Sequence, residues 1–246
     1  VINTQGAGGT IAKYANIASM KSSGIELTIS SKNMRTKDFS WNTDFIFSKT
    51  KNEITDLKSH ANVLSLISGN GFGREGYPVR GLFSIPFAGL TEDGLPTFIN
   101  QDGQKTISSF NFQEYEKLDF LKYEGPTDPT ITGSFGNILT YKNLKLNVFV
   151  TYSFGNVIRL DPVFSNAYSD LDAMPKEFKN RWMKAGDENV TNIPTIVSTR
   201  MNQQYAYLNM AYNAYNYSDV RIADGGFIRL KEISPVSYTH LRAHET

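Results

Sequence analysis

The stretch "YKNLKLNVFVTYSFG", residues 141–155, alternates apolar and polar side chains from Leu144 onward. This period of two predicts a β-strand with one apolar face. A soluble sandwich would bury that face, whereas a membrane barrel would turn it to lipid, and the alternation alone fits both. The row of about ten residues and its aromatic end, Tyr152 and Phe154, favour lipid. We therefore expect one row to face outward and the other to face a water-filled lumen, the rows being Leu144, Leu146, Val148, Val150 and Tyr152, and Lys145, Asn147, Thr151 and Ser153.

Other segments repeat this pattern. "GIELTISS" (24–31) and "FSWNTDFIFS" (39–48) predict one hairpin, and "TITGSFGNILTYKN" (130–143) pairs with residues 144–155 in a second. "YPVRGLFSIPFAGL" (77–90) is a weaker strand, because Pro86 cannot donate to a ladder. We expect about six to eight antiparallel strands in one curved, open sheet, since barrels of this kind close only with many more strands.

The segments between these strands are long and rich in turn-forming residues. Residues 59–77 and 91–128 predict irregular loops with a short helix at 112–118, and "PKEFKNRWMKAG" (175–186) predicts a further short helix. Tight turns at one end of the strands and long loops at the other are typical of outer-membrane barrels. The fold class is therefore all-β: part of a large transmembrane antiparallel barrel, with long extracellular loops and a short loop helix.

Composition excludes several functions. The 246 residues include 25 basic and 24 acidic ones, giving a formal charge of +1, and no cysteine. This balance does not point to nucleic acid, and the lack of thiols removes disulfides and cysteine chemistry. No run of about 18 apolar residues predicts a membrane helix, and "VINTQGAGGT" at the start does not read as a signal peptide.

Candidate catalytic and metal sites are weak. Four acidic residues are close in sequence: Glu114, Glu116, Asp119 and Glu124. A glycosidase needs two carboxylates close together in space, but a role as solvated charges in a loop explains these residues better. "EDGLP" (92–96), with Asp102 and Gly103, lacks the ligand series of a calcium loop, and "GNGFGREG" (69–76) lacks the context of a phosphate loop. His60 stands alone, and His240 and His244 lie among the last residues, 235–246. We predict no catalytic residue, no metal and no cofactor.

Aromatic residues are the candidates for ligand contact. Trp182 and Arg181 suit sugar recognition, although packing of the loop helix explains Trp182 better, because an indole buries a large apolar area. Five tyrosines fit an interface belt, loop packing or a carbohydrate-facing surface equally well: Tyr205, Tyr207, Tyr212, Tyr215 and Tyr217. The ligand-binding residues stay unassigned.

Several long segments also resemble the SusC/RagA family of TonB-dependent outer-membrane transporters, in the family's order. They are "MKSSGIELTI" (20–29), "EGYPVRGLFSIPFAGLTEDGLPTF" (75–98), "DPTITGSFGNILTYKNLKLNVFVTYSFGN" (128–156), "NRWMKAGDEN" (180–189) with "NIP" (192–194), and "SDVRIADGGFIRLKEIS" (218–234). In the family these landmarks lie toward the C-terminus, so residues 1–234 resemble the C-terminal part of the barrel.

The resemblance implies a barrel of about 22 strands in the bacterial outer membrane, blocked by a plug on which a TonB complex pulls. It implies import of oligosaccharides or peptides, with a SusD-like lipoprotein over the mouth. The plug, the TonB box and the signal peptide would lie outside this chain. Cargo identity, the cargo-contacting loop residues and the oligomeric state do not follow.

The last residues depart from the family. After "FIRLKEIS" the chain reads "PVSYTHLRAHET", where Pro235 would remove a ladder donor. We expect residues 235–246 to be a non-native tail. A second hypothesis for the whole chain is a secreted or surface β-domain that binds carbohydrate without transport. The apolar row of residues 144–154 discriminates between the two, because that domain would bury it between two sheets.

Overall fold

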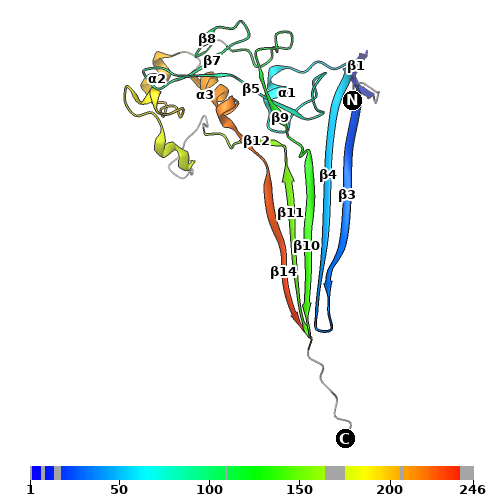
Figure 1. Cartoon of the computed structure of the whole chain (residues 1–246). Coiled ribbons are helices and arrows are strands. Elements are labelled where there is room, and N and C mark those ends of the chain that lie inside the picture. Colours follow the sequence, from blue (N-terminus) through cyan, green and yellow to red (C-terminus); the bar gives the residue numbers. More distant parts are fainter. Residues whose placement is uncertain are drawn as a thin grey trace. The chain divides into compact units, whose positions relative to one another are not determined.

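The computed structural model describes residues 2–6, 9–13, 18–108, 110–163, 175–205 and 208–238. Its main element is one long sheet of five strands: β3 (Ala18–Arg35), β4 (Phe39–Leu57), β10 (Ile131–Tyr141), β11 (Leu144–Phe154) and β14 (Phe227–Ser237). The strand order is β14-β11-β10-β4-β3, and these strands run side by side in Figure 1. β10 pairs antiparallel with both β4 and β11, and β11 pairs antiparallel with β14.

Two tight turns join neighbouring long strands, as the alternation predicted. β3 passes to β4 through residues 36–38, where the Thr36 hydroxyl accepts a hydrogen bond of 3.0 Å from the Phe39 amide. β10 passes to β11 through Lys142 and Asn143, and Lys142 adopts a φ of 52° that such short turns require. Both predicted hairpins are therefore confirmed.

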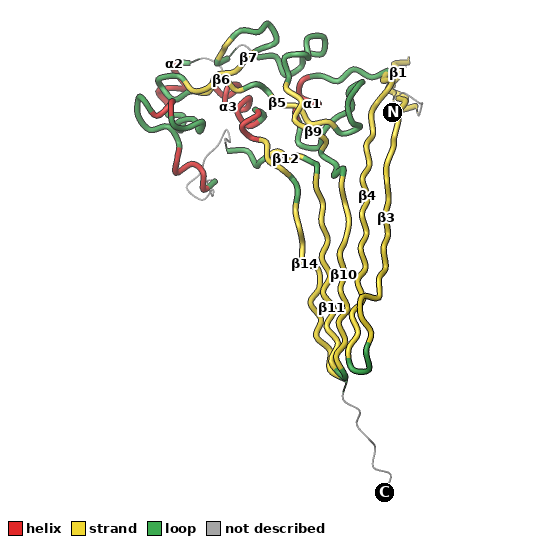
Figure 2. Tube along the Cα trace, in the orientation of Figure 1, coloured by secondary structure: helices red, strands yellow, loops and turns green. Residues whose placement is uncertain are grey.

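The other described strands are short and form separate small sheets (Figure 2). The two-stranded sheets are β1 (Ile2–Gly6) with β2 (Gly9–Lys13), β5 (Gly81–Ser84) with β9 (Lys122–Pro126), and β12 (Val157–Arg159) with β13 (Ile222–Asp224). A three-stranded sheet consists of β6 (Phe87–Leu90), β7 (Pro96–Ile99) and β8 (Lys105–Thr106). The expectation of six to eight strands in one sheet is thus wrong for the described residues, because the long sheet has five. Segments such as β5, whose four residues are all buried, pack into a core of their own instead.

The helices are short and differ from the expected ones. They are α1 (Val63–Ile67), α2 (Thr199–Gln204), α3 (Leu208–Asn216) and the 3₁₀ turns η1 (Lys176–Asn180), η2 (Asp187–Asn189) and η3 (Asp219–Arg221). The helix expected at 112–118 is a series of turns, because the Glu114 carboxylate accepts hydrogen bonds from the amides that follow it. The helix expected at 175–186 forms only the 3₁₀ turn η1. None of the helices in the described ranges is long and apolar enough to span a bilayer.

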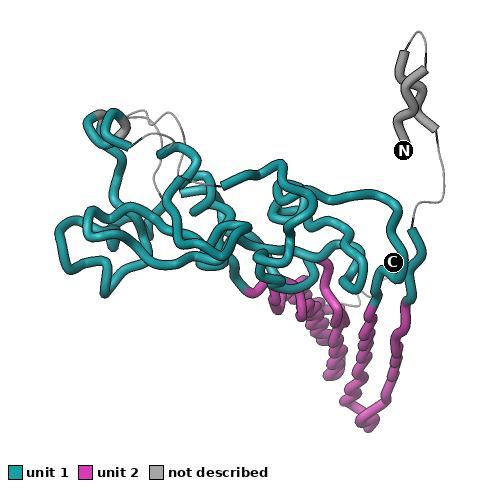
Figure 3. Tube along the Cα trace, turned by 90° about the horizontal axis from the view of Figure 1, so that it is seen from above, with its two compact units in different colours: residues 1–21, 52–127, 157–223 teal, residues 22–51, 128–156, 224–246 magenta. Residues whose placement is uncertain are grey.

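The chain divides into two compact units, coloured separately in Figure 3. The loop unit comprises residues 1–21, 52–127 and 157–223, and the sheet unit comprises residues 22–51, 128–156 and 224–246. The loop unit has a packed core in which α1, β5 and α3 bury Leu66, Phe83 and Tyr212 almost completely. The long loops are therefore folded and not irregular.

Strand β14 continues through Pro235, which lies opposite Leu146 and does not end the ladder. β14 is the last strand of the described sheet, and proline is tolerated where its missing N–H faces an unpaired edge. The Tyr238 amide then donates a hydrogen bond of 2.9 Å to the Asn143 carbonyl. Pro235 removes one ladder donor, as expected, and the strand continues past it. Residues 239–246, with His240 and His244, lie outside the described residues.

Candidate functional site

The register of the long sheet gathers its apolar rows on one side. Val150 lies opposite Phe135, which lies opposite Phe45, and Leu146 is aligned in the same way with Leu139 and Trp41. Directly opposed residues of an antiparallel pair share a face. We call this side the apolar face; it carries Phe39, Trp41, Phe45, Phe47, Phe135, Leu139, Tyr141, Leu144, Leu146, Val148, Val150 and Tyr152. The other side, the polar face, carries Lys145, Asn147, Thr151 and Ser153.

A β-bulge keeps β14 in phase with this pattern. Val150 pairs with Leu230 and Phe149 with Glu232, so Lys231 is an extra residue without an opposite. The sequence alternation breaks at the same place, because Leu230 and Ile233 are three residues apart. The bulge returns Ile233 to the apolar face, opposite Val148.

Burial in the sheet unit is the reverse of that in a soluble protein. All buried apolar side chains of the described residues belong to the loop unit. In the sheet unit the buried polar side chains are Ser134, Ser153 and Asn156, whereas Leu144 is 57% exposed and Ile228 is 70% exposed. Water would strongly disfavour such an arrangement, whereas lipid would not.

Aromatic side chains mark two levels on the apolar face. Phe39, Trp41 and Tyr141 lie near the tight turns, and Phe45, Phe47 and Tyr152 lie level with the other ends of β10 and β11. Eight residues separate Phe39 from Phe47, which is about 27 Å along a strand. At the usual barrel tilt this becomes roughly 20 Å, close to the apolar band of an outer-membrane barrel, with its aromatic girdles.

A polar cluster lies between these levels on the apolar face. Asn137 Oδ1 accepts hydrogen bonds of 2.8 Å from both Trp41 Nε1 and Thr43 Oγ1. Thr43 Oγ1 in turn accepts one of 2.5 Å from Asn33 Nδ2. The cluster therefore links β3, β4 and β10 through side chains, and sequence alternation gave no signal for it.

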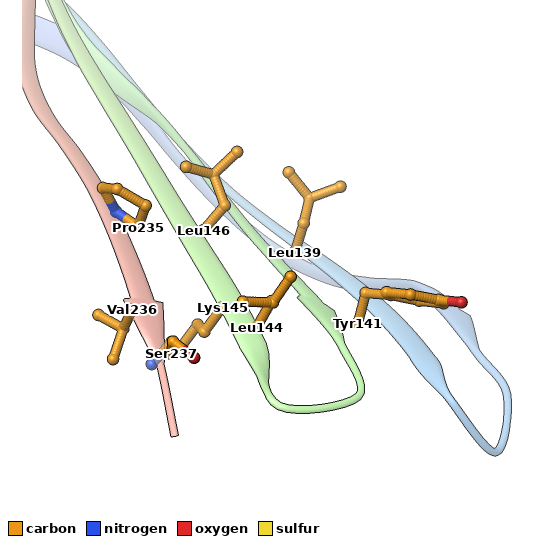
Figure 4. A pocket seen from close by; sticks show the side chains of 8 residues that line it. All are labelled: Leu139, Tyr141, Leu144, Lys145, Leu146, Pro235, Val236 and Ser237. Carbon is orange, nitrogen blue, oxygen red and sulfur yellow. The ribbon is translucent and has the colours of Figure 1, made fainter. Parts of the chain in front are cut away.

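The apolar face is also hollowed near the tight turns. A crevice of about 350 Å³ is lined mainly by apolar groups of β10, β11 and β14, including Leu139, Leu146 and Pro235 (Figure 4). Lys145 and Ser237 are the polar residues among those that line it. Its composition suits a hydrocarbon chain and offers few groups that could orient a polar cargo.

A partly buried arginine, Arg159, links several elements of the loop unit. Arg159 Nε donates to the Ile67 carbonyl at 2.9 Å, and Nη2 donates to the Phe83 carbonyl at 2.7 Å. Nη1 donates to the Asn216 and Ser218 carbonyls. Burial lowers the pKa of Arg159 to about 10, so the group stays charged at neutral pH. One guanidinium thus joins α1, β5 and the end of α3.

The four acidic residues considered as a catalytic set have separate structural roles. The Glu114 carboxylate caps its own turn, and the amides of Glu116 and Lys117 lower its pKa. Asp119 pairs with Arg74, and Glu124 accepts from Ser84. Glu116 is exposed. Their arrangement offers no acid–base pair around a shared site.

The suspected calcium and phosphate loops are ordinary turns. Asp102 pairs with Lys117 at 2.7 Å, and Asn100 closes the turn that contains Gly103. Gly71 has a φ of 68°, the left-handed backbone that favours glycine in a turn. Within the described ranges no three His, Asp or Glu side chains come together as a metal set.

Three contacts hold Trp182 in place, two of its indole and one of its backbone. Its Nε1 donates a hydrogen bond of 3.1 Å to Glu188 Oε2, and its backbone amide donates to the Ile193 carbonyl at 2.9 Å. The ring lies so close to Gly94 that a Cβ there would overlap it. The Glu188 backbone amide and the Trp182 indole lower the pKa of the Glu188 carboxyl. Trp182 therefore packs against the turn at Gly94, although it lies beyond η1 and not on the expected loop helix.

The same indole also lines a small open cavity. This cavity of about 270 Å³ is bordered by Asp93, Trp182, Thr195, Met201, Gln204 and Tyr205. The Tyr205 hydroxyl donates a hydrogen bond of 3.0 Å to Asp93 Oδ2, which raises the pKa of that tyrosine. Arg181 does not border the cavity; its Nη1 donates to the Phe178 carbonyl. Sequence reasoning singled out Trp182 and Tyr205 but missed Asp93 and Gln204 as their neighbours.

The other tyrosines of the candidate group serve packing. Tyr212 and Tyr215 on α3 are almost completely buried, and burial raises the pKa of Tyr215 to about 12. Tyr217 packs edge-on against Phe112, with ring centroids 6.3 Å apart. These three form no interface belt. Tyr207 lies outside the described residues.

A sheet with one exposed apolar face, bounded by aromatic levels and joined by tight turns at one end, defines a part of the wall of a membrane-spanning antiparallel barrel. Proteins similar to the chain agree with this class. It is 24% identical over 249 residues to TonB-dependent receptor P3 of Formosa agariphila, covering 92% of this chain and 22% of that receptor. It is also 24% identical to TonB-dependent receptor P39 of the same organism, covering 87% of this chain and 24% of that receptor.

Solved structures show the same fold. The structure of the RagAB peptide transporter matches with a TM-score of 0.62 and 21% identity, over 90% of this chain and 23% of the matched one. The RagAB peptide importer in its open-open state matches with a TM-score of 0.61. No family model matches the chain. The expected likeness to SusC/RagA-type TonB-dependent proteins is confirmed, as is the expected location in the bacterial outer membrane. The chain spans less than a quarter of each relative.

Proposed function

We propose that this chain forms wall strands and cell-surface loops of a TonB-dependent importer in the bacterial outer membrane. The observation that carries the proposal is the inverted burial of the sheet unit, where Leu144 is 57% and Ile233 is 59% exposed beside a buried Ser153. Contact with hydrocarbon makes that arrangement favourable, because it removes these apolar side chains from water. TonB-dependent receptors and RagAB, to which the chain is similar, support the same role.

In this role each face of the sheet meets a different solvent. The apolar face contacts outer-membrane lipid, and the polar face, with Lys145, Asn147 and Thr151, lines the lumen. Two long segments, one between β4 and β10 and one between β11 and β14, connect the strand ends that are opposite the tight turns. In outer-membrane barrels the tight turns are periplasmic, so these long segments belong to the cell surface.

The cargo and partners follow from the same proposal. The loop unit contacts an oligosaccharide or peptide cargo and a SusD-like lipoprotein, and the TonB complex acts through a plug outside this chain. The matched RagAB structures are named as a peptide transporter and a peptide importer, which supports import as the function of the whole protein. We further propose that residues 1–234 correspond to the C-terminal part of the barrel and that residues 235–246 are non-native.

Two other readings are weaker. A secreted β-domain would bury the apolar row between two sheets, but the sheet unit, as far as it is described, contains one sheet, in which Leu144 is exposed and Leu146, Val148, Val150 and Tyr152 are half-buried. An enzyme would need a preorganised set of reacting groups, whereas Glu114, Asp119 and Glu124 each have a separate structural partner. We propose that the protein is a transporter component and not an enzyme.

The proposal is tested on the full-length protein in its bacterial host. Outer-membrane fractionation and heat-modifiable migration in gels report insertion of a folded barrel. Growth on a glycan or peptide as sole carbon source, with and without the gene, reports import. We expect a heat-modifiable outer-membrane protein whose deletion abolishes growth on one cargo class. Recovery of the folded protein from the soluble fraction would refute the proposal.

A further inference from the structure

The cavity beside Trp182 combines one aromatic wall with a few polar groups. Trp182 and Met201 supply apolar surface, while Asp93, Gln204 and Tyr205 supply a carboxylate, an amide and a phenol. Apolar lining with a small number of placed polar groups is the usual composition of small-molecule sites. At about 270 Å³ the cavity lies just under the size range of about 300–1,000 Å³ usual for such sites, so it suits a single ring.

The walls of this cavity are fixed before any ligand arrives. Trp182 Nε1 is tied to Glu188, and the indole lies flat against the backbone of Gly94, which has a φ of 76°. The Thr195 amide donates a hydrogen bond of 3.0 Å to the Gly94 carbonyl. These bonds connect the turn at residues 91–95 with the segment that carries Trp182. A preorganised wall loses little entropy on binding.

The polar groups stand at the rim of the cavity, on the side chains of Asp93 and Gln204. Asp93 Oδ2 is held by the Tyr205 hydroxyl at 3.0 Å, which orients the carboxylate, and both Asp93 and Gln204 are exposed to solvent. A carboxylate accepts hydrogen bonds on both oxygens, and an amide both donates and accepts. The pair is therefore matched to a ligand that carries several neighbouring hydroxyl groups.

We propose that this cavity is a binding subsite for one neutral pyranose ring of an oligosaccharide, which stacks on Trp182 and donates hydroxyl hydrogens to Asp93. Gln204 contacts a neighbouring hydroxyl. The negative charge of Asp93 disfavours uronic acids and sulfated sugars, because the Asp93 carboxylate would repel the carboxylate or sulfate of such a ligand. The assignment rests on the proposed import function only for its physiological meaning, since binding itself is measurable on the purified protein.

The experiment uses the full-length protein, purified in detergent, and titration calorimetry. The probes are neutral hexasaccharides (maltohexaose, cellohexaose, mannohexaose and xylohexaose), an acidic alginate hexamer and a hexaalanine peptide. We expect binding of at least one neutral probe and of neither of the other two. Trp182→Ala weakens that binding by about tenfold or more, because the stacking surface is lost. Gln204→Ala, at an exposed position, weakens it by about two- to tenfold.

Two further variants distinguish the loss of a ligand contact from a structural effect of the substitutions. Asp93→Asn keeps the shape, weakens the neutral probe and relaxes exclusion of the alginate hexamer. Met183→Ala is the matched control, since Met183 is 66% exposed on the same segment and does not border the cavity. Wild-type binding only to peptide or alginate overturns the proposal, as does no binding of any probe. Neutral-probe binding that Trp182→Ala, Gln204→Ala and Asp93→Asn all leave unchanged also overturns it. Outer-membrane fractionation, measured on the same proteins, reports the proposed function separately.

Discussion

The indole Nε1 of Trp41 donates a hydrogen bond of 2.8 Å to Asn137 Oδ1, diagonally across two neighbouring strands of the long sheet. Trp41 lies opposite Leu139 in the register, and Asn137 lies opposite Thr43, whose hydroxyl donates to the same oxygen. The acceptor therefore serves two donors on the apolar face. If that face meets lipid, no water is present to replace the acceptor when it is removed.

The first prediction concerns this acceptor. Asn137→Ala leaves the Trp41 indole and the Thr43 hydroxyl without their shared partner, which should lower the free energy of unfolding by about 1–2 kcal/mol. Urea unfolding of the full-length barrel in phospholipid bilayers, followed by tryptophan fluorescence, measures the change. Asn147→Ala on the polar face is the matched control, because water in the lumen solvates that position. Equal effects of the two variants would contradict the role of Asn137.

The second prediction concerns Gly133, which lies opposite Tyr152 in β11. The Tyr152 ring covers this glycine, and its hydroxyl donates a hydrogen bond of 2.8 Å to the Ile46 carbonyl. A methyl group at residue 133 would overlap both the ring and that carbonyl, so Gly133→Ala should cost about 1–3 kcal/mol.

Gly136→Ala provides the comparison for Gly133→Ala. Its added Cβ would lie 3.3 Å from Phe149 Cδ2, on a ring that can shift. We expect a smaller loss of stability, measured by the same urea unfolding. A larger loss for Gly136→Ala than for Gly133→Ala would show that Tyr152 does not confine residue 133.

The sequence predicts the sheet unit well, because each strand's side chains alternate with a period of two. Both hairpins and the shared face of Leu144 to Tyr152 follow from that period alone. The loop unit is less predictable, because its core is made by contacts between distant residues, such as Arg159 with the Phe83 carbonyl. Isolated turn-forming residues reveal nothing about such contacts.

The candidate cavity shows the same limit. Trp182 and Tyr205 were recognisable as aromatic candidates from residue type alone. Asp93 joins them only because the turn at residues 91–95 packs under the Trp182 ring, with Gly94 in the left-handed region. No local pattern links residues that are more than 80 positions apart, so sequence reasoning interpreted Asp93 as part of a simple turn.

The third prediction concerns Arg159, whose guanidinium donates to four backbone carbonyls. A lysine ammonium has its three N–H donors on one nitrogen and cannot span these carbonyls, so Arg159→Lys should destabilise the loop unit by about 2–4 kcal/mol. Limited proteolysis of the full-length protein, with hydrogen exchange of α1 and α3, measures this loss. Lys184→Arg is the control, because it exchanges the same two residue types on a separate turn.

The pH dependence of Arg159 has a definite sign. Its folded pKa of about 10 lies below the ordinary value of 12.5, so the unfolded chain binds more protons between these two limits. Stability contributed by this group therefore rises with pH across that window and is constant below it. Protection of α1 should not change through Arg159 between pH 6 and 9. A gain of protection with rising pH in that range, abolished by Arg159→Lys, would contradict this pKa, because it would place the folded pKa of Arg159 below 9.

The last prediction tests which face meets lipid. Val148 lies in the middle of β11 on the apolar face, opposite Asn137 and Ile233, and the neighbouring Asn147 lies on the polar face. Val148→Arg should cost about 2–4 kcal/mol in the full-length barrel, because a charge near the bilayer midplane must deform the membrane to stay hydrated. Asn147→Arg places the same side chain in a water-filled lumen, so its folding cost should be much smaller, and cargo uptake should change instead. Heat-modifiability in outer-membrane extracts measures folding, and growth on the cognate cargo measures transport. Abolished folding of Asn147→Arg beside a harmless Val148→Arg would mean that the two faces are assigned the wrong way round.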